Sequence, residues 1–208
     1  MKGLLNNNQL KIIALITMTI DHIGVILFPN LKILRIIGRL AFPIFAYMIA
    51  EGAKYTKNRP KYLLTISLTA LICQAVYYFA ERSLDQCILV TFTASIILIY
   101  SLDYKFLSLP AIFGAFFLTE FLNIDYGFCG IMMPVILYIA DEKRKKLLYG
   151  TIMLILLSFF LGGVQWYSLF AIPLLALYNE KRGKLNLKYL FYIYYPLHLA
   201  VIYLISLY

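Results

Sequence analysis

Charged residues are scarce in this chain. They make up 14% of its 208 residues, whereas 62% are hydrophobic, and the mean hydropathy is +0.82. A soluble domain of this length needs far more polar surface, so the composition excludes one. Apolar stretches recur from one end of the chain to the other, with short polar breaks between them. We therefore expect a single integral membrane domain over residues 1–208.

The sequence also lacks the patterns of several common sites. Its two histidines and scattered acids have no metal-ligand spacing, so no metal site is expected. A glycine-rich phosphate loop and a serine hydrolase elbow are both missing. The three cysteines indicate no particular function. Cys87 and Cys129 both fall at the outer ends of expected membrane segments, so a disulfide between them is geometrically conceivable.

Nine apolar stretches approach the roughly 20 residues that a helix needs to cross a bilayer. Two of them, 128–140 and 166–178, are short enough to be re-entrant, tilted or locally thinning segments. Apolar residues occur on all sides of each stretch, which predicts helices buried in lipid and in each other. The expected fold class is all-α, a polytopic transmembrane helical bundle of about nine segments: 10–28, 33–52, 62–80, 87–102, 106–121, 128–140, 147–162, 166–178 and 189–207.

The basic residues gather on one side of the membrane when these segments alternate in direction. Only four of the 19, Lys32, Arg35, Arg39 and Arg82, lie on or towards the other side. The positive-inside rule makes the majority side cytoplasmic and places the N-terminus there. We expect a multi-pass protein of the bacterial cytoplasmic membrane, with the basic runs 143–146 and 181–188 as topology determinants and anionic-lipid contacts. Topology explains most of the +9 charge, so nucleic acid binding is not needed to account for it.

A carboxylate and an imidazole, Asp21 and His22, lie inside the first apolar stretch. Ionisable groups at membrane depth are costly and mark functional sites. Lys11 falls at the cytoplasmic rim of the same stretch, and His22 lies roughly 16 Å deeper at the helical rise per residue. Arg35 and Arg39 enter from the outer side, one helical turn apart and so on one face. We expect these two arginines to share a depth with Asp21 and His22, as candidate catalytic residues.

Three stretches of the chain look like the TraX family of membrane proteins, which is named for conjugal pilin N-acetylation. They are KIIALITMTIDHIG at 11–24, RIIGRLAFPIF at 35–45 followed by Glu51 and Gly52, and LFYIYYPLHL at 190–199. More distantly, Lys11 with ten residues before His22 resembles the acyltransferase-3 pattern of a basic residue, ten others and a histidine. Lys here replaces the usual Arg, which removes a bidentate phosphate contact but keeps a point charge.

The resemblance implies a membrane acetyltransferase that takes acetyl-CoA as co-substrate from the cytoplasm. The extracytoplasmic acceptor is a peptide N-terminus, a glycan or a lipid head group. Lys11 and three residues of the next basic loop would hold the CoA phosphates, and a continuous passage would carry the thioester to His22; the loop residues are Lys54, Lys57 and Arg59. His22 would be the general base, because an imidazole takes and returns a proton near neutral pH.

The other polar residues have more than one interpretation. Arg35 or Arg39 would stabilise the oxyanion or hold an anionic acceptor, whereas a network that merely neutralises Asp21 is the alternative. Asp21 could orient His22 only indirectly, since neighbouring helical positions point about 100° apart. Glu51 is expected to be an interfacial anchor or a partner for Lys54.

Three further residues are candidates for acceptor binding, each with a structural alternative. Glu120 and Asp125 border the outer region, where solvated acids are common. His198 lies near mid-membrane in the ninth segment, beside Pro196, where a packing hydrogen bond is the alternative to a site role. The whole chain has two alternative functions as well: a small transporter or flippase, or a non-catalytic assembly partner of a pilus or secretion apparatus.

Overall fold

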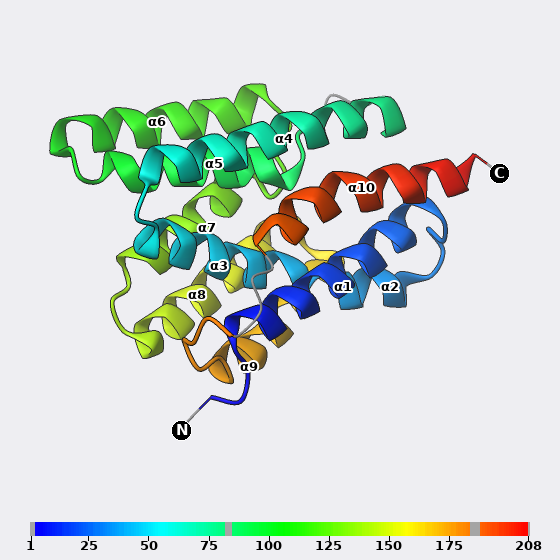
Figure 1. Cartoon of the computed structure of the whole chain (residues 1–208), viewed down its shortest axis with the longest axis horizontal. Coiled ribbons are helices and arrows are strands. Elements are labelled where there is room, and N and C mark those ends of the chain that lie inside the picture. Colours follow the sequence, from blue (N-terminus) through cyan, green and yellow to red (C-terminus); the bar gives the residue numbers. More distant parts are fainter. Residues whose placement is uncertain (1–2, 82–84, 184–187, 208) are drawn as a thin grey trace.

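The structure is a computed structural model that describes residues 3–81, 85–183 and 188–207. Helices account for most of this part of the chain, and its β-structure is limited to two isolated bridges. Each of the nine apolar stretches is helical and follows the expected order, so the prediction of an all-α helical bundle is confirmed (Figure 1). The elements are α1 (Asn7–Ile26), α2 (Lys32–Gly38), α3 (Ala41–Tyr55), α4 (Arg59–Glu81), α5 (Ile88–Ser101), α6 (Lys105–Phe121), α7 (Gly127–Ile139), α8 (Lys143–Leu161), η1 (Gly163–Phe170), α9 (Ala171–Ala176) and α10 (Lys188–Ser206).

The second expected segment is divided into α2 and α3 at Arg39 and Leu40. Pro43 explains the break, because a proline ring clashes with the carbonyl group four residues earlier, here that of Arg39. Pro43 is the third residue of α3, where the backbone N–H has no partner within the helix, so its own position costs no hydrogen bond. The break leaves Arg39 at the junction of two helices.

The eighth expected segment is also irregular. It consists of the 3-10 helix η1 followed by the short helix α9. Gly162 and Gly163, which join α8 to η1, have φ angles of 65° and 53°. Glycine adopts positive φ without the penalty that a Cβ atom brings, so the chain can turn sharply here. The turn carries Gln165 back into the bundle.

Helices α1 and α10 lie side by side and run in the same direction (Figure 1). Two hydrogen bonds fix this register, since Thr19 contacts Tyr194 and, further along both helices, His22 contacts His198. Alternating segments predict this direction for the first and the ninth. The C-terminal helix also packs against α4, so it lies between α1 and α4.

Helix α3 forms the centre of the bundle. Eleven of its fifteen residues are buried, and it packs against α1, α5, α7 and α9. Helix α6 packs on α5 and α7 and exposes several phenylalanines, among them Phe106 and Phe121 with more than four fifths of their surface accessible. Such a surface is unfavourable in water and suits a lipid environment.

Three helical segments of the described chain are long and apolar enough to cross a membrane: Asn7–Ile26, Lys32–Tyr55 and Arg59–Phe79. Together with the exposed apolar side chains, they indicate a membrane protein. The inside-outside orientation stays a prediction. Lys2, Arg82 and Lys184, which contribute to it, lie outside the described residues.

The three cysteines are free thiols, so the conceivable disulfide between Cys87 and Cys129 is not formed. The Cys87 thiol instead contacts the carbonyl oxygen of Ala70, at 3.8 Å.

Candidate functional site

Asp21 is the centre of a network of charged side chains at the junction of α1 and α2. Its Oδ2 atom accepts hydrogen bonds from Arg35 Nη1 at 2.6 Å and from Arg39 Nη2 at 2.5 Å. The two arginines reach one carboxylate because Arg35 on α2 and Arg39 directly after it are one helical turn apart, and α2 folds back beside α1 after a short loop. The ion pair expected between Asp21 and one of the arginines is therefore made with both.

Gly38 allows the close approach that this network needs. A Cβ atom at this position would lie 2.1 Å from Asp21 Oδ1 and 2.4 Å from Asp21 Cγ. Any other residue would therefore push the carboxylate away from the arginines. Sequence reasoning did not single out this glycine, although its place between Arg35 and Arg39 is a usable signal.

Arg39 extends the network to parts of the chain far away in sequence. Its Nη1 atom donates to the Tyr126 hydroxyl at 3.1 Å and to Gln165 Oε1 at 3.4 Å. Asp125 lies within electrostatic range of Arg39, Arg35 and Asp21. Three buried atoms of the network have no hydrogen-bond partner among the described residues: Asp21 Oδ1, Arg39 Nε and Gln165 Nε2. These atoms leave two donors and one acceptor unpaired within the network.

His22 has a different partner. Its Nδ1 atom lies 3.0 Å from Nε2 of His198, and Nδ1 of His198 lies 3.0 Å from the backbone oxygen of Tyr194. Asp21 and His22 point in different directions, as adjacent helical positions require. The two histidines, 176 positions apart in sequence, form one hydrogen-bonded pair across the interface of α1 and α10.

Two adjoining cavities lie on the N-terminal side of this pair. The first, which we call the mouth, has a volume of about 570 Å³ and a polar lining that includes Lys57, Glu180 and Arg182. The second, which we call the chamber, has a volume of about 140 Å³ and a lining that is mostly apolar. Six residues line both cavities, so the mouth and the chamber adjoin; they are Lys11, Met48, Gly52, Tyr62, Phe191 and Tyr192.

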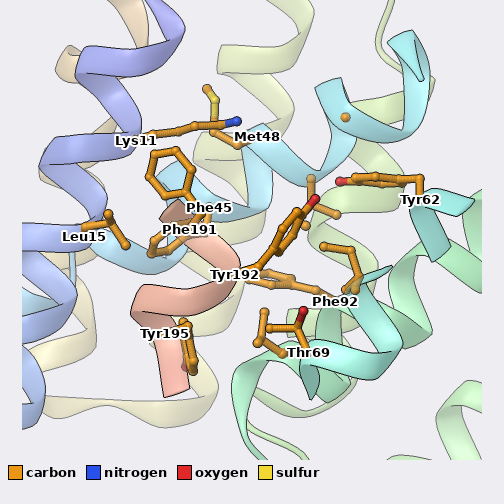
Figure 2. Close-up of a pocket in the computed structure, with 14 residues that line it drawn as sticks. Lys11, Leu15, Phe45, Met48, Tyr62, Thr69, Phe92, Phe191, Tyr192 and Tyr195 are labelled. Atoms are coloured by element: carbon orange, nitrogen blue, oxygen red, sulfur yellow. The ribbon is translucent and has the colours of Figure 1, made fainter. Parts of the chain in front are cut away.

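The chamber runs from Lys11 at one end to Tyr195 and Thr69 at the other (Figure 2). Helix α1 is unbroken between Lys11 and His22, so their axial separation of roughly 16 Å holds. The chamber nevertheless stops short of His22, which does not line it. The ring of Tyr195 lies edge-on to both imidazoles, with centroid distances of 6.5 Å to His22 and 5.3 Å to His198. The expected passage therefore reaches the ring of Tyr195 and not the imidazole itself.

Two of the four residues expected to hold the CoA phosphates line the cavities, and two do not. Lys11 lies where the two cavities meet, with its Nζ atom 5.1 Å from the centre of the Phe191 ring, and Lys57 lines the mouth. Lys54 instead pairs with Asp141 at 3.2 Å, and Arg59 pairs with Asp103; neither lines the mouth or the chamber. Arg182 also lines the mouth. The sequence does not predict this position, because Arg182 lies in the basic run 181–188, which is typical of a topology determinant.

Two lysines of the run 143–146 bond to other parts of the protein, so the expected lipid contact is wrong for the buried Lys146, whereas the expected role of the run in topology stays a prediction. Lys146 forms an ion pair with Glu51, and the two side chains are 3% and 8% exposed. Lys143 Nζ donates to the backbone oxygen of Ala176 at 2.7 Å. Glu51, which lines the mouth, is therefore paired with Lys146 and not with Lys54.

The structure does not bring Glu120 into the site. It is exposed near the end of α6, a helix that packs on α5 and α7. Asp125, in contrast, lies beside the network around Asp21, and His198 contacts His22 directly.

A comparison with known proteins shows what this chain is similar to. The family described as TraX protein matches residues 6–206. A probable fimbrial assembly protein FimC, serogroup H1, of Dichelobacter nodosus is 26% identical, and the alignment covers 93% of each chain. An uncharacterized protein, RP591, of Rickettsia prowazekii (strain Madrid E) is 32% identical over 66% of this chain and 57% of its own length. No solved structure matches.

The match to the family extends over nearly the whole chain and includes every residue of the mouth, the chamber, the histidine pair and the network around Asp21. The resemblance of the three sequence stretches is thereby confirmed, and this protein belongs to the TraX family.

Proposed function

We propose that this protein is a multi-pass acyltransferase of the bacterial cytoplasmic membrane, with its N-terminus in the cytoplasm. It transfers an acetyl group from cytoplasmic acetyl-CoA to an acceptor on the other side. One observation carries the proposal: a mouth with three basic residues adjoins a mostly apolar chamber, and Tyr195 at the far end of this chamber lies edge-on to the imidazoles of His22 and His198.

The mouth suits the nucleotide end of the donor. Lys11, Lys57 and Arg182 supply positive charge for the CoA phosphates. The chamber is narrow and mostly apolar, which suits a thin pantetheine arm that carries the thioester inward. His22 does not line the chamber, so transfer requires a rearrangement at its far end, where the Tyr195 ring lies edge-on to the His22 ring.

His22 is the proposed general base. An acceptor amine attacks the thioester carbonyl carbon, a C–N bond forms, and the C–S bond breaks. His22 takes the proton from the attacking nitrogen and returns it to the departing CoA sulfur, so the base is restored. Arg39 or Arg35 is proposed to stabilise the oxyanion, since Asp21 holds both guanidinium groups in a fixed position.

The acceptor is proposed to be a pilin-like protein subunit. The family is named for pilin acetylation, and one relative is a probable fimbrial assembly protein. The outer network offers Arg39 Nε, Gln165 Nε2 and Asp21 Oδ1 as unpaired donors and acceptor for a polar chain end.

Labelling tests the proposed activity. We expect purified protein, incubated with radiolabelled acetyl-CoA and envelope fractions, to transfer label to one macromolecule, which electrophoresis and mass spectrometry then identify. The control is the same fraction without the protein. Absence of transfer to any protein, glycan or lipid would contradict the proposal.

Replacing Lys11 by methionine tests the mouth. Because a hydrogen bond to a charged group contributes about 1.5–3 kcal/mol, we expect KM for acetyl-CoA to rise about tenfold or more, with kcat little changed. Steady-state kinetics with labelled donor measure both values. Lys105→Met is the matched control, since Lys105 is exposed and lies in neither cavity. Equal KM values for the two variants would remove Lys11 from donor binding.

The fimbrial assembly relative also favours a second candidate, a non-catalytic assembly partner. This function predicts stable co-purification with another membrane protein of a pilus apparatus. It also predicts that fibre assembly tolerates His22→Ala, whereas the acetyltransferase does not.

A further inference from the structure

His198 has no part in the mechanism so far, yet it is the hydrogen-bond partner of His22. It is buried, with 6% of its surface exposed. The hydrogen bonds around the two rings determine which nitrogen of each ring carries the proton.

The backbone oxygen of Tyr194 fixes the state of His198. A carbonyl oxygen only accepts hydrogen bonds, so Nδ1 of His198, at 3.0 Å, must carry a proton. In a neutral imidazole one nitrogen is protonated and the other has a lone pair. Nε2 of His198 is therefore an acceptor.

The state of His22 follows from that of His198. Nε2 of His198 accepts, so Nδ1 of His22, 3.0 Å away, must donate. The backbone oxygen of Met18, one turn earlier on α1, also interacts with the His22 ring and is likewise an acceptor. The remaining nitrogen of neutral His22, Nε2, then holds a lone pair.

The surroundings hold His198 in place. The Tyr194 ring stacks on the His198 ring with an interplanar angle of 8° and a centroid distance of 5.3 Å. The Tyr194 hydroxyl is bonded to Thr19 Oγ1 at 2.8 Å, which ties the stacked rings to α1. Tyr195 covers the two imidazoles from another side, edge-on.

We propose that His198 is a positioning residue that holds His22 in the tautomer with a basic Nε2 atom. The inference rests on the proposed function, in which His22 is the general base. When Nε2 of His22 takes the acceptor's proton, Nδ1 keeps its own proton and its hydrogen bond to His198. His198 neither gains nor loses a proton in the cycle; it orients the ring and stabilises the imidazolium.

Nitrogen-15 NMR of the two histidine rings tests the tautomers without any reference to activity. The chain has only two histidines, so protein labelled with ¹⁵N-histidine in nanodiscs gives two ring systems. In the unsubstituted protein we expect both rings to be protonated at Nδ1 and unprotonated at Nε2. A proton at Nε2 of His22, or a doubly protonated ring at neutral pH, would overturn the inference.

Variants of His198 separate positioning from packing. His198→Leu removes the side-chain acceptor and leaves only the backbone oxygen of Met18 beside the His22 ring, so we expect the Nδ1-protonated population of His22 to fall and kcat to drop about 10²-fold or more, with KM for acetyl-CoA unchanged. His198→Gln keeps an acceptor oxygen and should restore the tautomer and part of kcat. Tyr194→Phe removes the bond to Thr19 but keeps the stacked ring, and should leave the tautomer unchanged.

The outcomes are distinguishable. If His198→Leu does not fold, His198→Gln tests the inference instead: the Nδ1-protonated tautomer of His22 and part of kcat should be kept, and loss of the tautomer in this variant would overturn the inference. If the tautomers are as expected but no variant or parent protein transfers acetyl groups, the proposed function fails and the positioning geometry stands. If the parent protein is active and His198→Leu changes neither spectrum nor kcat, His198 has only a structural role.

Discussion

Replacement of His22 by alanine is expected to lower the rate of acetyl transfer about 10²–10⁴-fold, the usual contribution of a general base. The described residues offer no imidazole at the position of His22 once it is replaced, because the ring of His198 is held on α10 by its hydrogen bond to the backbone oxygen of Tyr194. The measurement is single-turnover transfer of label from acetyl-CoA to the acceptor in membranes.

Expression and membrane insertion should be intact in this variant, since a small residue in an apolar helix removes no ion pair. Ile16→Ala is the matched control: Ile16 lies on the same helix with an exposed side chain, and its replacement should leave the rate unchanged. Activity close to that of the parent protein in His22→Ala would remove His22 from the mechanism.

Replacement of Asp21 by alanine is expected to have the largest effect on stability, about 3–5 kcal/mol of unfolding free energy. Asp21 is the shared carboxylate partner of Arg35 and Arg39, and its side chain is 13% exposed. Its removal leaves two partly buried guanidinium groups without their counter-charge. Unfolding in a denaturing detergent titration measures the loss.

An exposed ion pair gives the matched control. Asp141 pairs with Lys54 but is 87% exposed, so Asp141→Ala should cost less than about 1 kcal/mol. A variant in which Asp21, Arg35 and Arg39 all become apolar should recover much of the stability lost in Asp21→Ala. Equal costs for Asp21→Ala and Asp141→Ala would show that the network is not a structural centre.

Local patterns in the sequence predict the helices and one part of the site, the network of Asp21 with Arg35 and Arg39. An apolar stretch is a local pattern, because it is read from residues that are neighbours in sequence. Each such stretch is found in the structure as a helical segment. The spacing of Arg35 and Arg39, one turn apart, places both on one face, and a short loop brings that face to Asp21. The break between α2 and α3 could also have been predicted, because Pro43 marks it.

Contacts between distant helices could not be predicted in the same way. The pairing of His22 with His198 depends on α10 lying beside α1, and no pattern in either helix specifies its neighbour. Lys146 looks like any other lysine of a basic run, and only the position of α8 beside the end of α3 shows that Glu51 faces it. The mouth combines Lys11, Lys57 and Arg182 from three separate segments for the same reason.

The ring of Tyr195 has a chemical consequence for the proposed enzyme. Water enters the mouth as readily as a donor does, and a base in open contact with it would hydrolyse the thioester without any acceptor. The ring lines the chamber and lies edge-on to both imidazoles, so in the proposed mechanism it would shield a waiting donor from activated water. Futile loss of acetyl-CoA would thereby be suppressed until the ring is displaced.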